Sequence, residues 1–537
     1  MSKNLRALTA RNGLDNSLLA SLRDAARSGE GLSAEHVRGL AEACLLTPAA
    51  VLGAASFYDF LKPLEKNRRA HVCSGTACML AGRQEEVRDC LVHTFGAEQV
   101  GTVACVGHCY RGGGHQIDGD NFDAGDLDAD GAAPDKSIPY VCAAPRSVFE
   151  YGGDIEAYYR LALRGAAAIR RELQASQLRG RGGAGFPFAR KLEACAAAQG
   201  ALKYIVCNGD EGDPGAFSDR WLMEERPHLL LAGMFAAGMA AGARHGVVYL
   251  RAEYPVAAKR IQQAIDIFHA LPDARESGFR FYLVRGAGSY VCGEETALLN
   301  SIEGLRPEVR IRPPYPAQAG LFDRPTLVSN VETFACVPWI LEHGGKAFSA
   351  LGAARSKGNK LMCLDSRFHR PGVYEVEMGL PFERVLFDLG GGFRAPVKAL
   401  QVGGPLGGVV PIERASGLAV DYESFAAAGY LLGHASVVAI PAGYPMLDFL
   451  RHLFHFCAEE SCGKCYPCRL GTRRGFELLQ AASAEQPIDT SAFADLLETL
   501  ELGSLCALGG GLPLPVRNIL EHFGDELRAV FAVGGAP

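Results

Sequence analysis

Cysteine spacing constrains this chain more than any other feature of its sequence. Seventeen cysteines occur in 537 residues, and eight of them fall into two groups with the spacing of metal ligands. The N-terminus lacks an apolar stretch of signal-peptide length, so we expect a cytoplasmic location, where disulfide bonds are rare. The sequence therefore predicts cysteine-bound metal centres rather than a disulfide framework.

The C-terminal group consists of Cys462, Cys465 and Cys468 in ESCGKCYPCR, followed by Cys506 in ELGSLCALGG. Three cysteines in one C-x2-C-x2-C run with a distant fourth are typical of a 4Fe–4S cluster. The alternative is a four-cysteine zinc site, which usually takes two C-x2-C pairs. We expect the nearby Cys457 to be a core residue rather than a fifth ligand.

The N-terminal group consists of Cys73 and Cys78 in HVCSGTACMLAG, and Cys105 and Cys109 in VACVGHCYRGG. Four thiolates in two loop pairs fit a 2Fe–2S cluster, and the small residues between them suit a loop that folds around inorganic sulfide. The alternatives are a zinc ribbon or a redox disulfide pair, both of which favour C-x2-C spacing.

Composition narrows the class of protein further. The net charge is −6, and no long run of Lys or Arg appears, so we expect no nucleic-acid partner. No apolar stretch reaches the ~18 residues that a membrane-spanning helix requires, and the longest candidate, 229–243, is too short. We therefore expect no direct membrane insertion.

The distribution of apolar residues, glycines and cysteines divides the chain into six segments. Short strand-like runs at 204–207, 247–250 and 279–284 alternate with helical stretches such as 257–270, which predicts an α/β domain. The acidic, glycine-rich stretch 118–136 resembles a loop or linker. We expect a helical region at 1–66, a first cysteine domain at 67–130, a linker at 131–149, the α/β domain at 150–369, a β-rich domain at 370–440 and a helical domain with the second cysteine group at 441–537.

A glycine-rich loop, QLRGRGGAG, spans residues 177–185. Its glycines allow the backbone to approach a ligand closely, and Arg179, Arg181 and Lys191 add positive charge. This pattern favours a phosphate cradle ahead of a helix N-terminus. The alternative is a flexible turn without a ligand.

Two acidic loops follow predicted strands. CNGDEGDPGAFSDR (207–220) contains four carboxylates, and GAGSYVCGEETALLNSIEG (286–304) opens a helix with two glutamates. Loops at the carboxyl ends of strands bind ligands in α/β folds. The carboxylates could hold a metal ion or could hydrogen-bond a nucleotide, and the lack of nearby histidines favours the nucleotide.

Taken together, these motifs resemble a known family. Residues 150–537 look like the NADH-binding flavoprotein subunit of respiratory complex I and the diaphorase subunits of NAD-dependent formate dehydrogenases and NAD-reducing hydrogenases. LRGRGGAGFP, CNGDEGDPG, YVCGEETALLNSIEG, SNVET and ESCGKCYPCR carry the resemblance. Residues 30–115 resemble the thioredoxin-like 2Fe–2S partner subunit through SFYDF, CSGTAC and CVGHC. The fusion of the two and the segment VYLRAEYP are closer to the formate dehydrogenase and hydrogenase diaphorases.

The resemblance implies a Rossmann-like FMN and NADH domain, a small ubiquitin-like β-rich domain and a helical 4Fe–4S domain. It implies that FMN is held by Gly180, Arg181, Gly182, Gly183, Lys191, Asn208, Asp210, Glu211, Gly293, Glu294, Glu295 and Asn330. It places NAD(H) over the flavin, with aromatic surfaces from Phe186 and Tyr315 and with Asp213 near the adenosine ribose. Arg312 and Ser329 complete the candidate cofactor site.

The chain departs from the family pattern around the glycine-rich loop. Phe188, Ala189 and Leu192 stand where the family usually has Thr, Gly and Trp, so that Phe188 puts a large side chain beside the expected nucleotide path. Asp213 replaces a Glu, and a carboxylate there should repel a 2′-phosphate and favour NAD over NADP.

Three further positions also differ, because Arg312 and Tyr315 replace Lys and Phe, and Ser329 replaces Asn. The 2Fe–2S domain is shortened, and the segment after Cys109 lacks the apolar strand of the family.

The resemblance implies an electron-transfer subunit without a catalytic acid or base, in which the flavin exchanges hydride with NAD(H) and single electrons with the clusters. We expect it to reduce NAD+ with electrons from the catalytic and iron–sulfur subunits of a formate dehydrogenase or hydrogenase. The alternatives are a non-catalytic electron-wire subunit with a blocked nucleotide pocket, and a component of a complex I-type NADH:quinone oxidoreductase.

Overall fold

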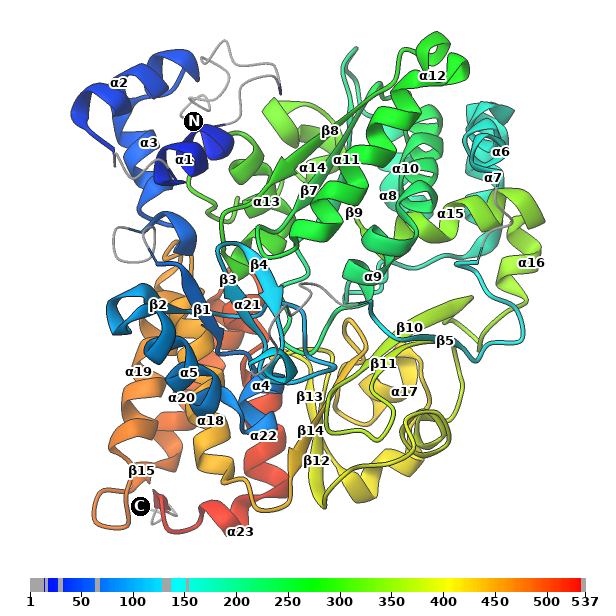
Figure 1. Ribbon diagram of the computed structural model, residues 1–537. Helices are drawn as coiled ribbons and strands as arrows, with labels where there is room; N and C mark the ends of the chain where they lie inside the picture. Colours follow the sequence, from blue (N-terminus) through cyan, green and yellow to red (C-terminus); the bar gives the residue numbers. More distant parts are fainter. Residues whose placement is uncertain are drawn as a thin grey trace.

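The computed structural model describes residues 14, 18–27, 32–62, 68–127, 137–150 and 154–532. Sheets of four, six, four and two strands are surrounded by helices (Figure 1). The multidomain α/β class predicted from the sequence is confirmed. Of the segments predicted, parts of the N-terminal helical region and residues 131–136 of the linker lie outside the described residues.

The N-terminal region is helical where it is described, in α1 (Leu18–Arg27), α2 (Ala34–Ala43) and α3 (Pro48–Ala55). The Ser33 and Thr47 side chains cap α2 and α3 by accepting hydrogen bonds from main-chain N–H groups of the first turn. Figure 1 shows these helices, in dark blue, beside the central parallel sheet.

The first cysteine domain contains a four-stranded sheet in the order β2–β1–β3–β4, with bounds Val100–Val103, Ala70–Cys73, His115–Ile117 and Asp120–Phe122. Helices α4 (Thr76–Ala81) and α5 (Gln84–Phe95) pack beside it. The expectation that 118–136 is only a loop is wrong for 120–122, because β4 pairs with β3 through a tight antiparallel turn. Residues 128–136 of that stretch lie outside the described part of the chain.

The central sheet is parallel, in the order β8–β7–β6–β9, with bounds Arg280–Arg285, His245–Leu250, Tyr204–Gly209 and Thr326–Asn330. The predicted strands therefore exist. Alternate residues of β6 face opposite sides, as the twofold repeat of a strand requires. Tyr204 and Val206 pack with the N-terminal helices, whereas Ile205 and Cys207 join the main core.

Helices cover the second face of this sheet and its ends, except that the helix at 295–302 lies on the same face as the N-terminal helices. They are α6 (Ile155–Leu161), α7 (Ala166–Ser176), α8 (Phe188–Ala197), α9 (Ser218–Glu225), α10 (Pro227–Ala241), α11 (Pro255–Ala270), α12 (Pro272–Ser277), α13 (Glu295–Ile302), α14 (Pro316–Ala319), α15 (Val331–His343) and α16 (Gly345–Ser349). The apolar helix α10 is buried on nearly all sides against this sheet and α15.

Within the described residues, no single helix is long and apolar enough to cross a bilayer. The bent pair α2 and α3 meets that criterion only when its two helices are taken together, with 107° between them.

The six-stranded sheet has the order β13–β12–β14–β10–β11–β5. Its bounds are Gly408–Pro411, Val397–Val402, Ser436–Pro441, Asn359–Leu364, Gly372–Glu377 and Tyr140–Cys142, and α17 (Tyr422–Ala427) packs beside it. The sheet extends beyond the predicted range 370–440, because β10 forms an antiparallel hairpin with β11 and β5 adds an edge strand from the predicted linker.

The C-terminal region is helical, as expected. It contains α18 (Met446–Glu459), α19 (Tyr466–Ala481), α20 (Thr490–Gly503), α21 (Ala507–Gly510), α22 (Pro513–His522) and α23 (Gly524–Leu527), with a parallel pair of strands, β15 (Ile488–Asp489) and β16 (Phe531–Ala532). A Cβ atom added at Gly475 would lie 2.1 Å from the Phe454 ring, so α18 and α19 approach too closely for a larger residue.

A fully buried ion pair joins the α/β domain to the six-stranded sheet. Lys360 of β10 pairs with Glu332 of α15, and neither side chain is exposed. The other Glu332 oxygen accepts a hydrogen bond of 3.0 Å from the Leu361 main-chain N–H. Removing one member of such a pair leaves an uncompensated buried charge.

We expect Glu332→Ala to destabilise the protein by about 3–5 kcal/mol, because the Lys360 ammonium would remain buried without its partner. The measurement is the urea midpoint followed by circular dichroism. Glu477→Ala, which breaks an exposed ion pair with Arg473, is the control and should cost less than about 1 kcal/mol. Equal shifts for the two variants would contradict the assignment.

Candidate functional site

A cleft lies at the carboxyl edge of the parallel sheet. Its main cavity has a volume of about 230 Å³. A second cavity adjoins it, and the two share Gly182, Asn208, Gly293 and Asn330. The ends of β6 and β9 and the loop after β8 thus converge on one site, as the topology of a parallel sheet requires.

The glycine-rich loop forms one wall of this cleft. A Cβ atom at Gly182 would lie 3.0 Å from the Asn330 Cβ, and Gly183 has a φ of +124°, which favours glycine. Gly180 lines the second cavity, together with Phe186 and Ser329. The loop therefore brings its backbone close to any ligand, as the sequence predicts.

Positive charge is arranged differently from the prediction. The Arg181 guanidinium is buried away from the cleft and donates to the Met378 sulfur and the Lys357 carbonyl. Arg179 pairs with Glu423. Arg181 is thus not available to a phosphate, because its side chain joins the glycine loop to the β-rich domain.

Of the three predicted cations, Lys191 does line the second cavity, where it pairs with Glu295 at 2.7 Å. Arg312 pairs with the same carboxylate at 2.9 Å and lies 3.5 Å from Glu294. Glu294 also caps α13 by accepting hydrogen bonds from the first-turn N–H groups.

The acidic loop after β6 forms the floor of the main cavity. Asn208 donates to the Gly293 carbonyl at 2.7 Å and thereby joins this loop to the one after β8. Burial raises the pKa of Asp210 well above its usual range. Asp213 accepts a hydrogen bond of 2.7 Å from the Tyr290 hydroxyl, and burial raises its pKa as well.

The two predicted aromatic surfaces are exposed. Phe186 is 48% accessible and lines the second cavity, whereas Tyr315 is 56% accessible. Of the predicted cofactor residues, all of which are described, four do not line either cavity: Arg181, Gly183, Arg312 and Tyr315. The remaining thirteen do.

Phe188 borders the second cavity but does not project across it. Its side chain is 1% accessible, and its ring packs edge-on against Phe334 at 5.8 Å between centroids. Leu192, one turn further along α8, is fully buried. The blockage that the sequence suggests at Phe188 is therefore not seen, because the ring is part of the helix core.

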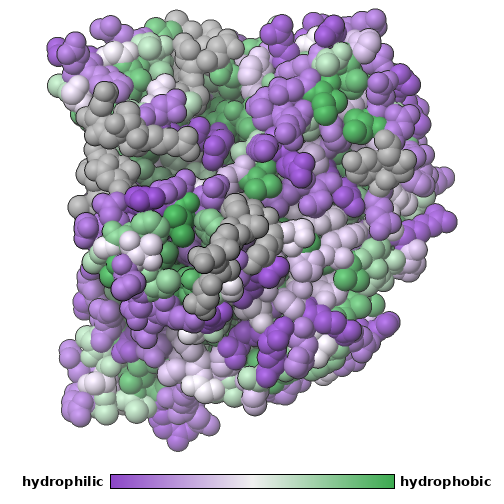
Figure 2. Space-filling view, viewed as in Figure 1, coloured by the Kyte–Doolittle hydropathy of each residue, from purple (hydrophilic) through white to green (hydrophobic). Residues whose placement is uncertain are grey.

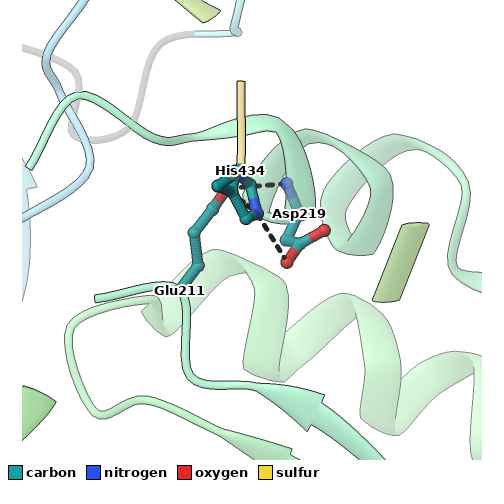
Figure 3. Close-up of side chains that lie close together, drawn as sticks. All are labelled: Glu211, Asp219 and His434. Atoms are coloured by element: carbon teal, nitrogen blue, oxygen red, sulfur yellow. Dashed lines mark hydrogen bonds and ion pairs between the residues drawn. The ribbon is translucent and has the colours of Figure 1, made fainter. Parts of the chain in front are cut away.

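Two residues of the site, His434 and Asp219, are not among the predicted cofactor residues, although Asp219 is one of the four carboxylates of the acidic loop. Figure 3 shows both beside Glu211, and the His434 Nε2 lies 3.2 Å from Asp219 Oδ2 and 3.6 Å from Glu211 Oε1. The nucleotide interpretation of these carboxylates relies on the lack of a nearby histidine. That premise is wrong, since the fold supplies a histidine 215 residues away, from a segment without a recognisable motif.

The first cysteine group forms a compact buried site. Cys73 ends β1, Cys78 lies in α4, and the Cys105 and Cys109 sulfurs are 3.6 Å apart. Main-chain N–H groups point at three of the sulfurs, from Gly107 to Cys105 at 3.3 Å, from Gly114 to Cys78 at 3.4 Å and from Gly215 to Cys109 at 3.2 Å. Such donors stabilise thiolates and bound sulfide, so the site fits an iron–sulfur cluster.

A buried arginine connects this cysteine site to the cleft. Arg251, just after β7, donates to the main-chain carbonyls of Cys105, at 2.7 Å, and of Glu211. It also pairs with Glu253 at 2.8 Å. The first cluster site therefore lies directly behind the acidic floor of the cleft.

The second cysteine group surrounds the start of α19. Cys465 is the N-cap of this helix, Cys468 lies in its first turn, and Cys462 comes just before it. Cys506 packs against the cluster of side chains that contains Cys462, and a Cβ atom at Gly509 would lie 2.8 Å from the Cys468 Cβ, so the fourth cysteine lies close to the other three. The positive end of the α19 dipole favours the negative charge of a thiolate-bound cluster.

Cys506 belongs to both sites. It lies among the second group of sulfurs, and it also lines the main cavity with Ala507 and Leu508. A ligand in the cleft would therefore contact the segment that carries a cluster ligand.

Comparison with known families matches three regions of the chain. The Nuo51 FMN-binding domain matches residues 173–339, and the NADH-ubiquinone oxidoreductase-F iron-sulfur binding region matches residues 448–530. The thioredoxin-like [2Fe-2S] ferredoxin family matches residues 6–130, which includes most of the segment predicted as a separate helical region. The eight predicted cluster cysteines all fall inside the two iron–sulfur regions.

Individual relatives agree. The chain is 41% identical over 370 residues to NADP-reducing hydrogenase subunit HndC of Solidesulfovibrio fructosivorans, covering 66% of this chain and 74% of the relative. It is 35% identical over 373 residues to the mitochondrial NADH dehydrogenase [ubiquinone] flavoprotein 1 of Dictyostelium discoideum, covering 67% of this chain and 78% of the relative.

A solved structure also matches nearly the whole chain. A crystal structure of NAD+-reducing [NiFe]-hydrogenase in the air-oxidized state superposes with a TM-score of 0.86 and 29% identity, covering 98% of this chain and 96% of that chain. The fold, including the fused N-terminal region, thus occurs in a single polypeptide elsewhere.

Substituting one ligand in each cysteine group should remove one cluster and leave the other. We expect Cys105→Ala to lose about two of about six iron atoms, and Cys506→Ala to lose about four, because a cluster short of one thiolate is labile. Iron and sulfide analysis with EPR of the reduced protein provides the measurement. Cys90→Ala, outside both groups, serves as control, and zinc in place of iron in wild-type protein would refute the assignment.

Proposed function

The chain belongs to the family of NADH-binding flavoprotein subunits of complex I and NAD(P)-reducing hydrogenases, and we propose that it supplies NADH from electrons of a hydrogenase or formate dehydrogenase. Members of this family are oxidoreductase subunits that exchange hydride between NAD(H) and FMN and single electrons with 2Fe–2S and 4Fe–4S clusters. The observation that supports this role best is the cleft itself, where the strand-end loops and Cys506 line one cavity.

FMN supplies the conversion between two-electron and one-electron chemistry when it is bound. The chain supplies the surroundings. We propose that the backbone of the glycine-rich loop and Lys191 hold the phosphate end, and that Asn208, Asp210 and Glu211 hold the ring system. The cluster at Cys506 is the nearest electron exit from this cleft, whereas the first cluster lies behind the acidic floor and is suited to storing one electron.

The non-catalytic alternative rests on a blocked nucleotide pocket. Phe188 and Leu192 are core residues, and Phe186 leaves an exposed aromatic surface beside the second cavity. The arrangement favours an enzyme that binds NAD(H). A cytoplasmic location is part of this proposal, because none of the cysteines, all of which are described, forms a disulfide bond, as expected in a reducing compartment.

We propose that partner subunits bind beside the second cluster. Tyr466 is 75% exposed and Leu502 is 76% exposed. The end of α20 contacts the start of α19, because a Cβ atom at Gly503 would lie 2.7 Å from Pro467. With Leu470 and Leu505 they form the α19–α20 patch. The face of the molecule drawn in Figure 2 is mainly hydrophilic, and its apolar side chains occur in small groups. Exposed apolar residues around a cluster ligand fit a protein interface.

The purified chain with FMN should reduce ferricyanide with NADH, because hydride transfer and electron exit both lie within this polypeptide. Absence of activity in protein that contains FMN and both clusters would overturn the proposed enzyme role.

Purification from its native host, followed by identification of the associated subunits, distinguishes a hydrogenase partner from a formate-oxidising one.

Leu502→Glu should keep this NADH:ferricyanide activity but should lose electron transfer from the native partner by at least ~10-fold, because a charge at the centre of an apolar interface costs more than about 1.4 kcal/mol. Ile267→Glu, at an exposed apolar position on α11, is the matched control. Normal coupling in the Leu502 variant would exclude the α19–α20 patch as the interface.

Asp213 should set the preference for NAD over NADP. We expect Asp213→Asn to raise kcat/KM for NADPH relative to NADH by about 10-fold, because a carboxylate no longer opposes the 2′-phosphate. Steady-state kinetics with both nucleotides measures the ratio. Asp273→Asn, on the surface at α12, should leave the ratio unchanged, and an unchanged ratio in the Asp213 variant would assign nucleotide choice to other residues.

A further inference from the structure

His434 is held rigidly at the edge of the cleft. It lies between Gly433, whose φ is +56°, and β14, and a Cβ atom at Gly433 would lie 2.6 Å from the Gly403 carbonyl oxygen. The same loop approaches the glycine-rich wall, because a Cβ atom at Gly183 would be 3.9 Å from the Gly433 backbone. Gly433 is needed for this close packing, so the imidazole has a defined position.

Two buried carboxylates face the imidazole. Nε2 lies 3.2 Å from Asp219 Oδ2 and 3.6 Å from Glu211 Oε1 (Figure 3). Asn330 donates to the same Asp219 oxygen, and the two Glu211 oxygens accept main-chain N–H bonds of 2.9 Å from Asp219 and Arg220. Hydrogen bonds to carboxylate oxygens stabilise their ionised form, but burial and the nearby Asp219 charge raise the pKa of Glu211 to about 7, so Asp219 supplies most of the negative charge beside Nε2 at neutral pH.

These charges keep the imidazole protonated. Burial alone lowers the pKa of His434, but Asp219 of α9 and Glu211 of the loop after β6 outweigh it and raise that pKa to about 9. Lys360 of β10 opposes them, and Asp213 is the further acid that interacts with His434. At neutral pH a buried imidazolium is therefore present beside the cleft.

The other ring nitrogen, Nδ1, has no hydrogen-bond partner in the part of the chain that the structure describes. His434 lines the main cavity, and its Nδ1 is buried without a hydrogen-bond partner among the described residues. A buried donor left unsatisfied costs about 1–3 kcal/mol, so this arrangement favours a ligand or an ordered water in the cleft that accepts the bond.

We propose that His434 is a further cofactor-contacting residue, whose Nδ1–H donates to the bound flavin and whose positive charge stabilises the flavin when it is reduced. This inference rests on the proposed FMN site. Uptake of a hydride, which carries two electrons and one proton, adds one negative charge to a flavin, and a fixed imidazolium in a site of low dielectric favours that state.

The same three side chains could instead hold a divalent cation, because their ligand atoms all lie within 4.8 Å of one another. The hydrogen bonds argue for the imidazolium. Both Glu211 oxygens and the nearer Asp219 oxygen already accept hydrogen bonds. The protonated ring therefore supplies the positive charge that a metal ion would otherwise supply to these carboxylates. Metal analysis is therefore one arm of the test.

His434→Asn in the full chain provides the test, since it retains a neutral amide and removes the charge. Spectroelectrochemical titration should give a more negative flavin midpoint potential than in wild-type protein. The difference in midpoint potential between the two proteins should be largest at pH 7. It should disappear as the pH rises through about 9, where the wild-type imidazole loses its proton. A purely structural role would not produce this pH dependence.

His434→Ala should weaken FMN binding by about 10-fold, measured by fluorescence after reversible removal of FMN, because one charge-assisted hydrogen bond is lost. His522→Asn is the matched control, since that partly buried histidine bonds Tyr430 at 3.0 Å and does not line the cleft. Unchanged iron content shows that the variants fold.

Potentials and FMN affinity equal to those of wild type would overturn the inference. So would stoichiometric zinc or manganese that His434→Asn loses. Failure of the wild-type chain to bind FMN would instead refute the proposed function itself, so the two failures are distinguishable.

Discussion

The buried guanidinium of Arg251 is the interaction on which the arrangement of the redox sites depends. It bonds the carbonyls of Cys105 and Glu211 and pairs with Glu253, and none of these groups has access to a replacement partner in water. One cation therefore fixes the loop of 2Fe–2S ligands against the floor of the flavin cleft. The separation of the two sites is set by packing within a single chain rather than by the association of two subunits.

Much of the site could be predicted because its parts are local in the sequence. The glycine-rich loop and the two acidic loops each place their functional groups within about 20 residues of one another, and the cluster cysteines occur in short pairs or runs with recognisable spacing. Thirteen of the predicted cofactor residues line the cleft for this reason. Strands β6, β7 and β8 were predictable for a similar reason, since continuous apolar runs are typical of buried parallel strands.

The remainder depends on contacts between distant segments. A sequence shows that Arg181 is charged but not that its side chain turns towards Met378, away from the cleft. It shows no relation between His434 and Asp219, and the pairing of β5 with β11 follows only from the completed sheet. The sequence shows that a large residue, Phe188, lies beside the expected nucleotide path, which suggests a blocked pocket as an alternative, whereas the direction of its ring depends on packing against Phe334.

The N-terminal helices have a consequence for biosynthesis. Their apolar faces pack on strands β6 and β7, and the Tyr58 hydroxyl hydrogen-bonds Ser301 across 243 residues of chain. At ~5–20 residues per second, the ribosome needs about 10–50 s to produce that partner surface. During this interval the helices leave the exit tunnel without the core they complete, so the first part of the protein to be made is among the last to acquire its native contacts.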